Sequence, residues 1–206
     1  IKALKKNNGK ILYSNDETYS SSNLINKSEI LFNDEQKKFL KNISKKYSYE
    51  DIVDIFHKCK KLKPIIIGET IIDEYVFCQV LGKSGKEPHM VIRDDFKETY
   101  LGGAGAIANH VSSFCDKNYF ISCIGDKKNY LKFIKKNLSK NIKINFIIKK
   151  NGPTILKKRF IDLISGNKLF GVYSMNDKSV DLNSSNKLIN LTRQHNLKSD
   201  LVIISD

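Results

Sequence analysis

Residues 65–75 read Ile-Ile-Ile-Gly-Glu-Thr-Ile-Ile-Asp-Glu-Tyr and decide the fold class of this chain. The β-branched run Ile65–Ile67 ends in Gly68, which is typical of a buried parallel strand in an α/β sheet. We expect Asp73 just beyond the carboxyl end of this strand, at the edge where open α/β sheets bind ligands. A carboxylate there can accept hydrogen bonds from two sugar hydroxyls, or it can cap a turn or a helix.

A second informative stretch, residues 101–109, reads Leu-Gly-Gly-Ala-Gly-Ala-Ile-Ala-Asn and predicts a helix that begins after two glycines. One apolar stripe follows helical spacing through Ala104, Ile107, Ala108 and Val111. Gly102 and Gly103 can expose free N–H groups and admit a ligand against the main chain, or they can simply form a tight turn.

The remainder alternates between short apolar runs and helical patterns, which predicts an α/β fold with a mainly parallel sheet. Residues 75–100 alternate loosely and predict a small antiparallel flap. Further strands are expected at 119–125, 144–148, 154–161, 168–173 and 201–205, and helices near 130–138 and 182–195. Residues 34–46 and 48–59 predict two more helices, and Ser48 with Asp51 has capping-box spacing for the second.

Two phosphate-binding motifs are absent from the sequence. Gly82-Lys83-Ser84 would need a glycine five residues earlier to form a P-loop, and that position is Phe77. The glycines at 102, 103 and 105 do not have the dinucleotide-binding spacing either, because Ala108 stands where a further glycine is needed.

The chain has 206 residues and a formal net charge of +14, from 36 basic and 22 acidic side chains. The lysines are scattered along the chain, so a solvated surface is favoured over a nucleic-acid interface. Four cysteines lack metal-ligand spacing and fit a reducing cytosol. We see no secretory signal or membrane span, and expect a cytoplasmic protein that does not bind membranes.

The two glycine-bearing segments resemble the ribokinase-like (PfkB) carbohydrate kinases, and the heptose-7-phosphate kinase branch in particular. Residues 67–75 resemble their opening strand and substrate aspartate, and 101–109 their Gly-Gly signature. Ser84 and Pro88 match that branch's flap, and residues 153–159 match its Pro-Thr-x-x-Lys-x-Arg strand. The resemblance covers about residues 63–206.

This resemblance implies ATP-dependent, Mg²⁺-assisted phosphorylation of a sugar or sugar phosphate. Asp73 and the backbone of Gly102 and Gly103 would hold the sugar, and Lys157 and Arg159 would lie near a substrate phosphate. A solvated strand face, or an ion pair with Asp162, is the alternative for those two cations. The flap would serve as a lid and as the contact of a homodimer.

The chain also departs from the family pattern. Ala106 and Ile107 stand where the family has asparagine, so the sugar-binding role is not transferred to Asn109. The family's catalytic Gly-Ala-Gly-Asp segment is missing, and Gly125-Asp126 matches an earlier loop. We therefore expect no catalytic residue and no metal ligand in this chain, which would hold part of a sugar site.

Residues 16–25 resemble a late segment of cytidylyltransferase-like nucleotidyltransferases, in which Ser20, Ser21 and Ser22 would contact nucleotide phosphates. A serine-rich helix cap is the alternative. The expected organisation is a nucleotidyltransferase remnant at 1–32, a helical linker at 33–62, and the N-terminal part of a PfkB kinase domain at 63–206. A bifunctional enzyme that makes a nucleotide-activated sugar would combine both activities, whereas a non-catalytic sugar-binding protein on the same fold is the alternative.

Overall fold

The computed structural model describes residues 32–127 and 130–205. The chain divides into two units whose boundary falls between Ile52 and Val53, and the second unit holds the sheet. Residues 1–31, and with them the predicted roles of Ser20, Ser21 and Ser22, lie outside the described residues. None of the described helices is both long enough and apolar enough to cross a membrane.

Both predicted helices ahead of the sheet are present, α3 (Asp34–Lys46) and α4 (Tyr49–Lys61). The capping box that the sequence predicts for α4 is confirmed. The Asp51 N–H donates to Ser48 Oγ at 3.1 Å, and the Ser48 N–H donates to Asp51 Oδ2 at 2.8 Å. These two bonds use N–H groups that have no partner within the helix.

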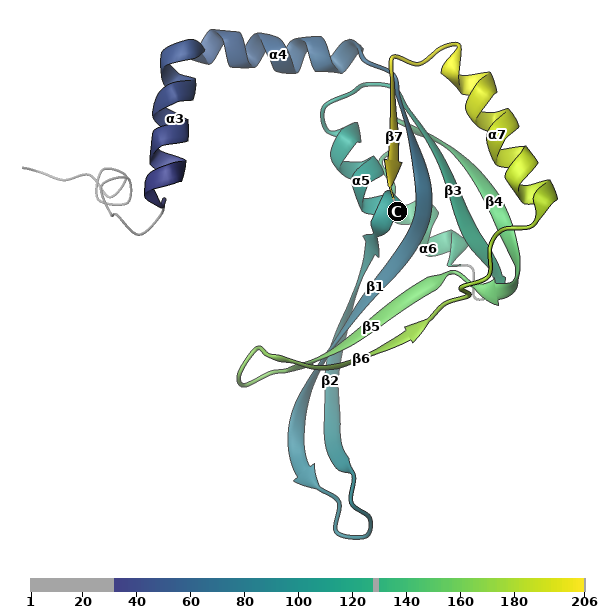
Figure 1. The fold of residues 1–206 in the computed structure, drawn as a ribbon. Helices are drawn as coiled ribbons and strands as arrows, with labels where there is room; N and C mark the ends of the chain where they lie inside the picture. Colours follow the sequence, from purple (N-terminus) through teal and green to yellow (C-terminus); the bar gives the residue numbers. More distant parts are fainter. Residues whose placement is uncertain (1–31, 128–129, 206) are drawn as a thin grey trace, which may run out of the picture. The chain divides into compact units, whose positions relative to one another are not determined.

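Seven strands form one sheet in the described part of the chain, and β1 (Pro64–Lys83) lies at its centre (Figure 1). The main path runs β4-β3-β1-β5-β6, and β2 and β7 also pair with β1. The other strands are β2 (Met90–Gly102), β3 (Asn118–Lys127), β4 (Ile142–Pro153), β5 (Ile155–Asp162), β6 (Lys168–Ser174) and β7 (Leu201–Ser205).

Strand β1 changes partners part-way along its length. Residues 64–69 pair in parallel with β3 on one side and β7 on the other, and residues 71–83 pair with β2 and β5. The prediction that the first strand ends at Gly68 was therefore wrong. The new partners satisfy the backbone groups of residues 71–78 on both sides, so the strand continues where the parallel sheet ends.

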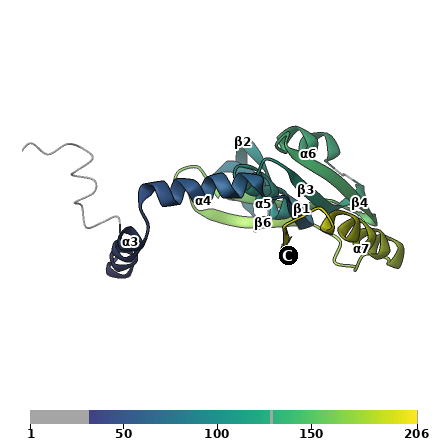
Figure 2. The same ribbon diagram turned by 90° about the horizontal axis from the view of Figure 1, so that it is seen from above.

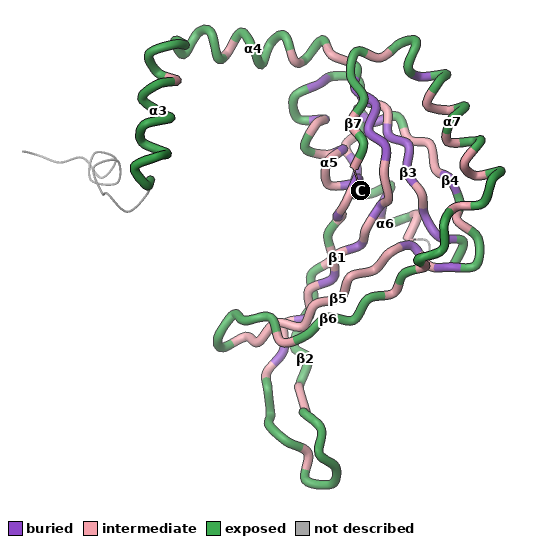
Figure 3. Tube along the Cα trace, in the orientation of Figure 1, coloured by how far each residue is buried: buried purple, intermediate pink, exposed green. Residues whose placement is uncertain are grey.

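The second half of β1 forms, with β2, β5 and β6, a flap that extends away from the parallel sheet (Figure 1). The flap predicted for residues 75–100 is confirmed, and it is larger than expected because β5 and β6 belong to it. Its tip is mostly exposed, whereas the parallel part of β1 is buried (Figure 3).

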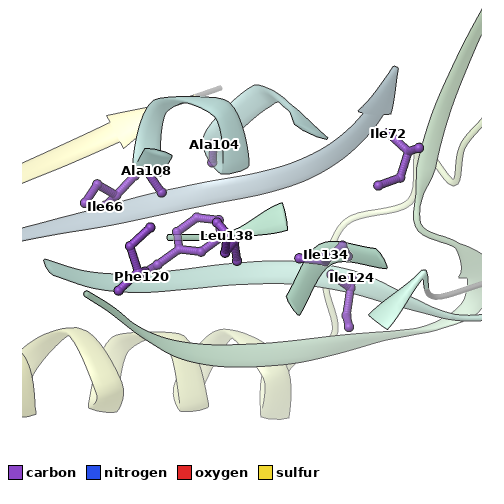
Figure 4. Packing of buried hydrophobic residues seen from close by; sticks show 9 residues of the cluster. Ile66, Ile72, Ala104, Ala108, Phe120, Ile124, Ile134 and Leu138 are labelled. Carbon is purple, nitrogen blue, oxygen red and sulfur yellow. The ribbon is translucent and has the colours of Figure 1, made fainter. Parts of the chain in front are cut away.

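Helices cover both faces of the parallel sheet (Figure 2). Helices α5 (Gly103–Ser112) and α6 (Leu131–Asn137) pack on one face, where Ile66 and Phe120 are fully buried (Figure 4). Helix α7 (Leu182–Asn196) packs its leucines on the other, against Ile65 and Ile121. Alternate residues of β1 and β3 thus serve opposite layers, which is why these strands lack polar alternation.

Candidate functional site

Asp73 lies where the parallel sheet passes into the flap. In β1 it is opposite Tyr100 of β2 on one side and Lys157 of β5 on the other. Because the predicted end of the strand at Gly68 is wrong, Asp73 occupies a strand interior and not a turn, and it caps no helix. Side chains two residues apart on a strand share a face, so Tyr75 lies on the same side as Asp73.

Arg159 of β5 donates a hydrogen bond from Nη1 to Asp73 Oδ1 and forms an ion pair with it. Each of the two side chains is 21% exposed. The hydrogen bond from Arg159 to the Asp73 carboxylate raises the pKa of the guanidinium, against the opposing effect of burial. The guanidinium also lies 5.5 Å from the centre of the Tyr75 ring, which is within cation–π range.

Gly102 lies directly beside Asp73, and Gly103 follows it against Glu69 and Ile71 of β1. A side chain at Gly102 would collide with Asp73 Oδ2, so the carboxylate lies against the bare backbone at the start of α5. Gly103 has φ of 53°, and a Cβ there would approach the Glu69 carbonyl oxygen to 2.7 Å. Close approach of β1 atoms therefore requires glycine at both positions, and the structure brings Gly102 together with Asp73 and Arg159.

Lys157 is opposite Asp73 in the register of β1 and β5. Its Nζ lies 6.0 Å from the centre of the Tyr173 ring, and within the described residues it forms no ion pair. The alternative in which Lys157 or Arg159 forms an ion pair with Asp162 is therefore wrong. Asp162 instead accepts hydrogen bonds from the Ser165 hydroxyl and N–H at 2.7 and 2.9 Å, and these bonds lower its pKa.

Tyr75 and Tyr100 lie on the same face of the flap as Asp73, and the sequence analysis did not predict either of them as part of the site. The rings of Tyr75 and Tyr100 meet edge to face, with centres 6.0 Å apart. The Tyr100 hydroxyl donates to Glu98 Oε2 at 2.6 Å, and this hydrogen bond raises the pKa of the phenol. The two-residue spacing of Asp73 and Tyr75 could have identified one of them, but Tyr100 depends on the strand register.

A second polar cluster lies at the carboxyl ends of the parallel strands. Lys149 Nζ is 3.6 Å from Glu69 Oε1 and donates to the Asn176 carbonyl oxygen at 2.6 Å. Asp126 accepts from the N–H groups of Asn151 and Gly152 at 2.9 and 3.1 Å, and the Asn151 bond is the main cause of its lowered pKa. Asp126 thus holds the backbone at Asn151 and Gly152 in place.

The described residues do not hold a metal site. No group of three or more His, Cys, Asp or Glu side chains in residues 32–127 and 130–205 is placed to bind an ion. Together with the absence of a P-loop, this means that we assign neither Mg²⁺ nor ATP to particular residues here.

No family model matches the chain. The bifunctional protein HldE of Nitratiruptor sp. is 27% identical over 147 residues, which cover 70% of this chain and 31% of that protein. HldE of Aliarcobacter butzleri is 29% identical over 152 residues, covering 71% and 31%. The chain thus spans about a third of the length of the curated relatives it matches.

Among solved structures, a possible 1-phosphofructokinase from Thermotoga maritima superimposes with a TM-score of 0.52 at 15% identity. The match covers 69% of this chain and 44% of that one. The chain has the fold of the ribokinase-like carbohydrate kinases. The predicted α/β class and the resemblance to these kinases are both confirmed, and the site around Asp73 lies at the base of the flap of this ribokinase-like fold.

Proposed function

We propose that this chain forms the sugar-binding part of a kinase that transfers the γ-phosphoryl group of ATP to a sugar or sugar phosphate. The observation that carries the proposal is the Asp73 carboxylate, which lies against the Gly102 backbone with Arg159 beside it. Similarity to the bifunctional HldE proteins along some 70% of the chain supports the same conclusion.

In this proposal Asp73 accepts hydrogen bonds from sugar hydroxyls and fixes the orientation of the ring. Holding the acceptor in one geometry accounts for a large share of phosphoryl-transfer catalysis, because the protein contributes mainly positioning and charge stabilisation. Arg159 and Lys157 would bind a phosphate already present on the substrate, since a guanidinium fork suits phosphate oxygens. A heptose 7-phosphate-like substrate fits this arrangement, and the Ser84, Pro88 and residue 153–159 matches favour that class.

ATP supplies the phosphoryl group in this proposal, and Mg²⁺ would neutralise its developing charge. Both are proposed for the whole protein and not for the described residues, which lack a metal-binding cluster. The described part of the chain contributes the acceptor side of the reaction.

We further propose a bifunctional protein of the cytoplasm, in which Ser20, Ser21 and Ser22 belong to a nucleotidyltransferase segment. A homodimer through the flap is part of the same proposal. It is supported by apolar side chains that the flap exposes, among them Met90, Phe170 and Val172, which are 60%, 45% and 51% exposed. Exposed apolar patches commonly mark protein interfaces.

The test is an ATP-consumption assay on the full-length protein with a panel of sugars and sugar phosphates, comparing wild type with Asp73→Ala. We expect sugar-dependent turnover in wild type and a decrease of at least about 100-fold in kcat/KM in the variant, because a misplaced acceptor costs that much. Asp95→Asn, which changes an exposed aspartate of β2, is the matched control and should keep wild-type turnover.

Sugar binding by calorimetry without turnover would favour a non-catalytic sugar-binding protein on the same fold. Turnover that survives Asp73→Ala would reject the role of Asp73.

A further inference from the structure

We propose that Cys59 and Cys115 form a modification site, at which a small-molecule disulfide oxidises the two thiols to a disulfide. The bond would tie the C-terminal half of α4 to the loop before β3. Both cysteines are free thiols in this structure. The inference goes beyond the proposed function and does not depend on it.

Two contacts hold the loop before β3 against the C-terminal half of α4. The ring of Phe56 in α4 stacks on that of Phe114, with the ring centres 5.7 Å apart. The Asp116 N–H donates to the Lys60 carbonyl oxygen at 3.1 Å. The two segments are thus joined by one aromatic contact and one backbone hydrogen bond.

The two cysteines lie between these contacts. Cys59 directly precedes the hydrogen-bonded residue of α4, and Cys115 directly precedes the hydrogen-bonded residue of the loop. On the helix, Cys59 also shares a face with Phe56, because residues three apart are neighbours on a helix surface. A disulfide joins Cα atoms about 4.4–6.8 Å apart, and a backbone hydrogen bond between the next two residues holds the chains at about that spacing.

Cys115 is a rigid and protected partner, which is 6% exposed. Its N–H donates to the Val111 carbonyl oxygen at 3.1 Å, and its carbonyl oxygen accepts from the side-chain amides of Asn118 and Asn141 at 2.7 and 3.0 Å. Burial raises the pKa of the Cys115 thiol, and the nearby Cys59 raises it further. Because the thiolate is the nucleophile, Cys115 is unreactive by itself.

Cys59 is the thiol that an oxidant reaches first. It is less buried than Cys115, and it lies among the basic residues of the last turn of α4, which are Lys58, Lys60 and Lys61. Their positive charge attracts an anionic oxidant such as glutathione disulfide. Cys59 is therefore the attacking thiol, and Cys115 is the thiol that resolves the mixed disulfide.

The reaction consists of two successive thiol–disulfide exchanges. The Cys59 thiolate attacks one sulfur of glutathione disulfide, which breaks the S–S bond and releases one glutathione. The Cys115 thiolate then attacks the Cys59 sulfur of the mixed disulfide and releases the second glutathione. The two protein sulfurs lose two electrons to glutathione disulfide, and the two protein thiol protons pass through solvent to the two glutathione thiols. Excess thiol reverses both steps.

The disulfide would change how firmly α4 is attached. No residue of α4 is buried, so its attachment in the reduced protein depends on surface contacts such as those of Phe56 and Lys60. A covalent bond persists when those contacts open, and it therefore slows local opening of the helix.

The experiment incubates the full-length protein with glutathione disulfide, alkylates the remaining thiols and identifies the products by peptide mass spectrometry. The variants are Cys59→Ser and Cys115→Ser. Cys123→Ser is the matched control, because Cys123 is also only partly buried and lies outside the pair. Circular dichroism establishes that each variant is folded, and hydrogen exchange of the α4 amides measures how firmly the helix is attached.

In wild type we expect a linked peptide pair that contains Cys59 and Cys115 and that dithiothreitol separates. Exchange of the α4 amides should be at least about fivefold slower in the linked protein. Cys115→Ser should instead accumulate a glutathione adduct on Cys59, because the resolving thiol is missing. Cys59→Ser should leave Cys115 unmodified, and Cys123→Ser should form the same linked pair as wild type.

Links from Cys59 to another cysteine or to a second chain would overturn the inference, as would stable glutathione adducts on both thiols of wild type. A Cys59–Cys115 bond that forms only in urea would show that the folded chain does not bring the thiols together. Unchanged exchange of α4 in the linked protein would overturn its role in attaching the helix. The ATP-consumption assay tests the proposed function separately from all of these outcomes.

Discussion

At the scale of single residues, Gly103 shows how backbone geometry restricts this site. Its φ of 53° lies in the left-handed region, and a Cβ there would come within 2.9 Å of Ile71 Cγ1. A side chain would suffer both conformational strain and a collision with the neighbouring strand.

We expect Gly103→Ala to lower the free energy of unfolding by roughly 1–3 kcal/mol, the usual cost of such strain. Urea denaturation monitored by circular dichroism measures it. Gly85→Ala is the matched control, since a Cβ at Gly85 meets nothing within 4 Å. Its effect should stay within about 0.5 kcal/mol, as for other surface substitutions. Equal stability of the two variants would contradict the strain argument.

At the scale of elements, three strands of the flap are joined through one carboxylate. Glu74 of β1 lies 2.9 Å from Lys158 of β5 and 3.5 Å from Lys97 of β2. Glu74 is 7% exposed, and burial by itself would raise its pKa. The hydrogen bond and charge of Lys158, followed by those of Lys97, outweigh burial and lower the pKa below its ordinary value of 4.5.

This lowered pKa makes the stability of the flap dependent on pH. The unfolded chain binds the Glu74 proton more readily than the folded chain does, so the contribution of Glu74 to stability is present above pH 4.5. It is lost as the pH falls through the lower folded value. We therefore expect Glu74→Gln to be less stable than wild type at pH 7 and to lose less stability on acidification.

Urea unfolding at a series of pH values from 7 to 3 measures this difference. Glu87→Gln, which alters a glutamate whose side chain is 80% exposed, is the control and should keep the acid dependence of wild type. An identical pH profile for wild type and Glu74→Gln would contradict the role of the ion pairs.

At the scale of the whole molecule, stability depends on the two layers that helices form on the parallel sheet. Phe120 of β3 is fully buried and belongs to the same cluster as Ile66, Ala104, Ala108 and Ile134. The cluster joins β1 and β3 to α5 and α6, and the N-terminus of α5 carries the glycines of the candidate site. Packing of this layer therefore positions the backbone beside Asp73.

We expect Phe120→Ala to reduce the free energy of unfolding by about 3–5 kcal/mol, the usual cost of removing a buried aromatic ring. Phe39→Ala, in the exposed helix α3, should change it by less than about 0.5 kcal/mol. Chemical denaturation compares them. A small effect of Phe120→Ala would show that the layer can repack around the cavity.

Much of the fold follows from local patterns in the sequence. The β-branched run at Ile65–Ile67, the Gly102-Gly103 pair and the alternation of strands and helices predict the α/β class and most elements. Ser48 and Asp51 form the predicted capping box. These features can be predicted from the sequence because periodicity and capping depend on residues that are close in sequence.

The length of β1 and the composition of the site depend on the tertiary structure. The strand continues past Gly68 only because β2 and β5 supply new hydrogen-bond partners. Ile71 of β1 is opposite Gly102 of β2 and Ile155 of β5, which lie 31 and 84 residues farther along the chain. Asp162 is near Arg159 in sequence, but it turns to Ser165, and Asp73 takes its place.

The sequence by itself thus determined only the residue types proposed for the site: an aspartate and two glycines for the sugar, and a lysine and an arginine for a substrate phosphate. Only the tertiary structure decided that Arg159 meets Asp73, because ion pairs between distant strands depend on register, which no local pattern encodes. The same register sends Lys157 to the face of Asp73 and Lys158 to Glu74 on the opposite face.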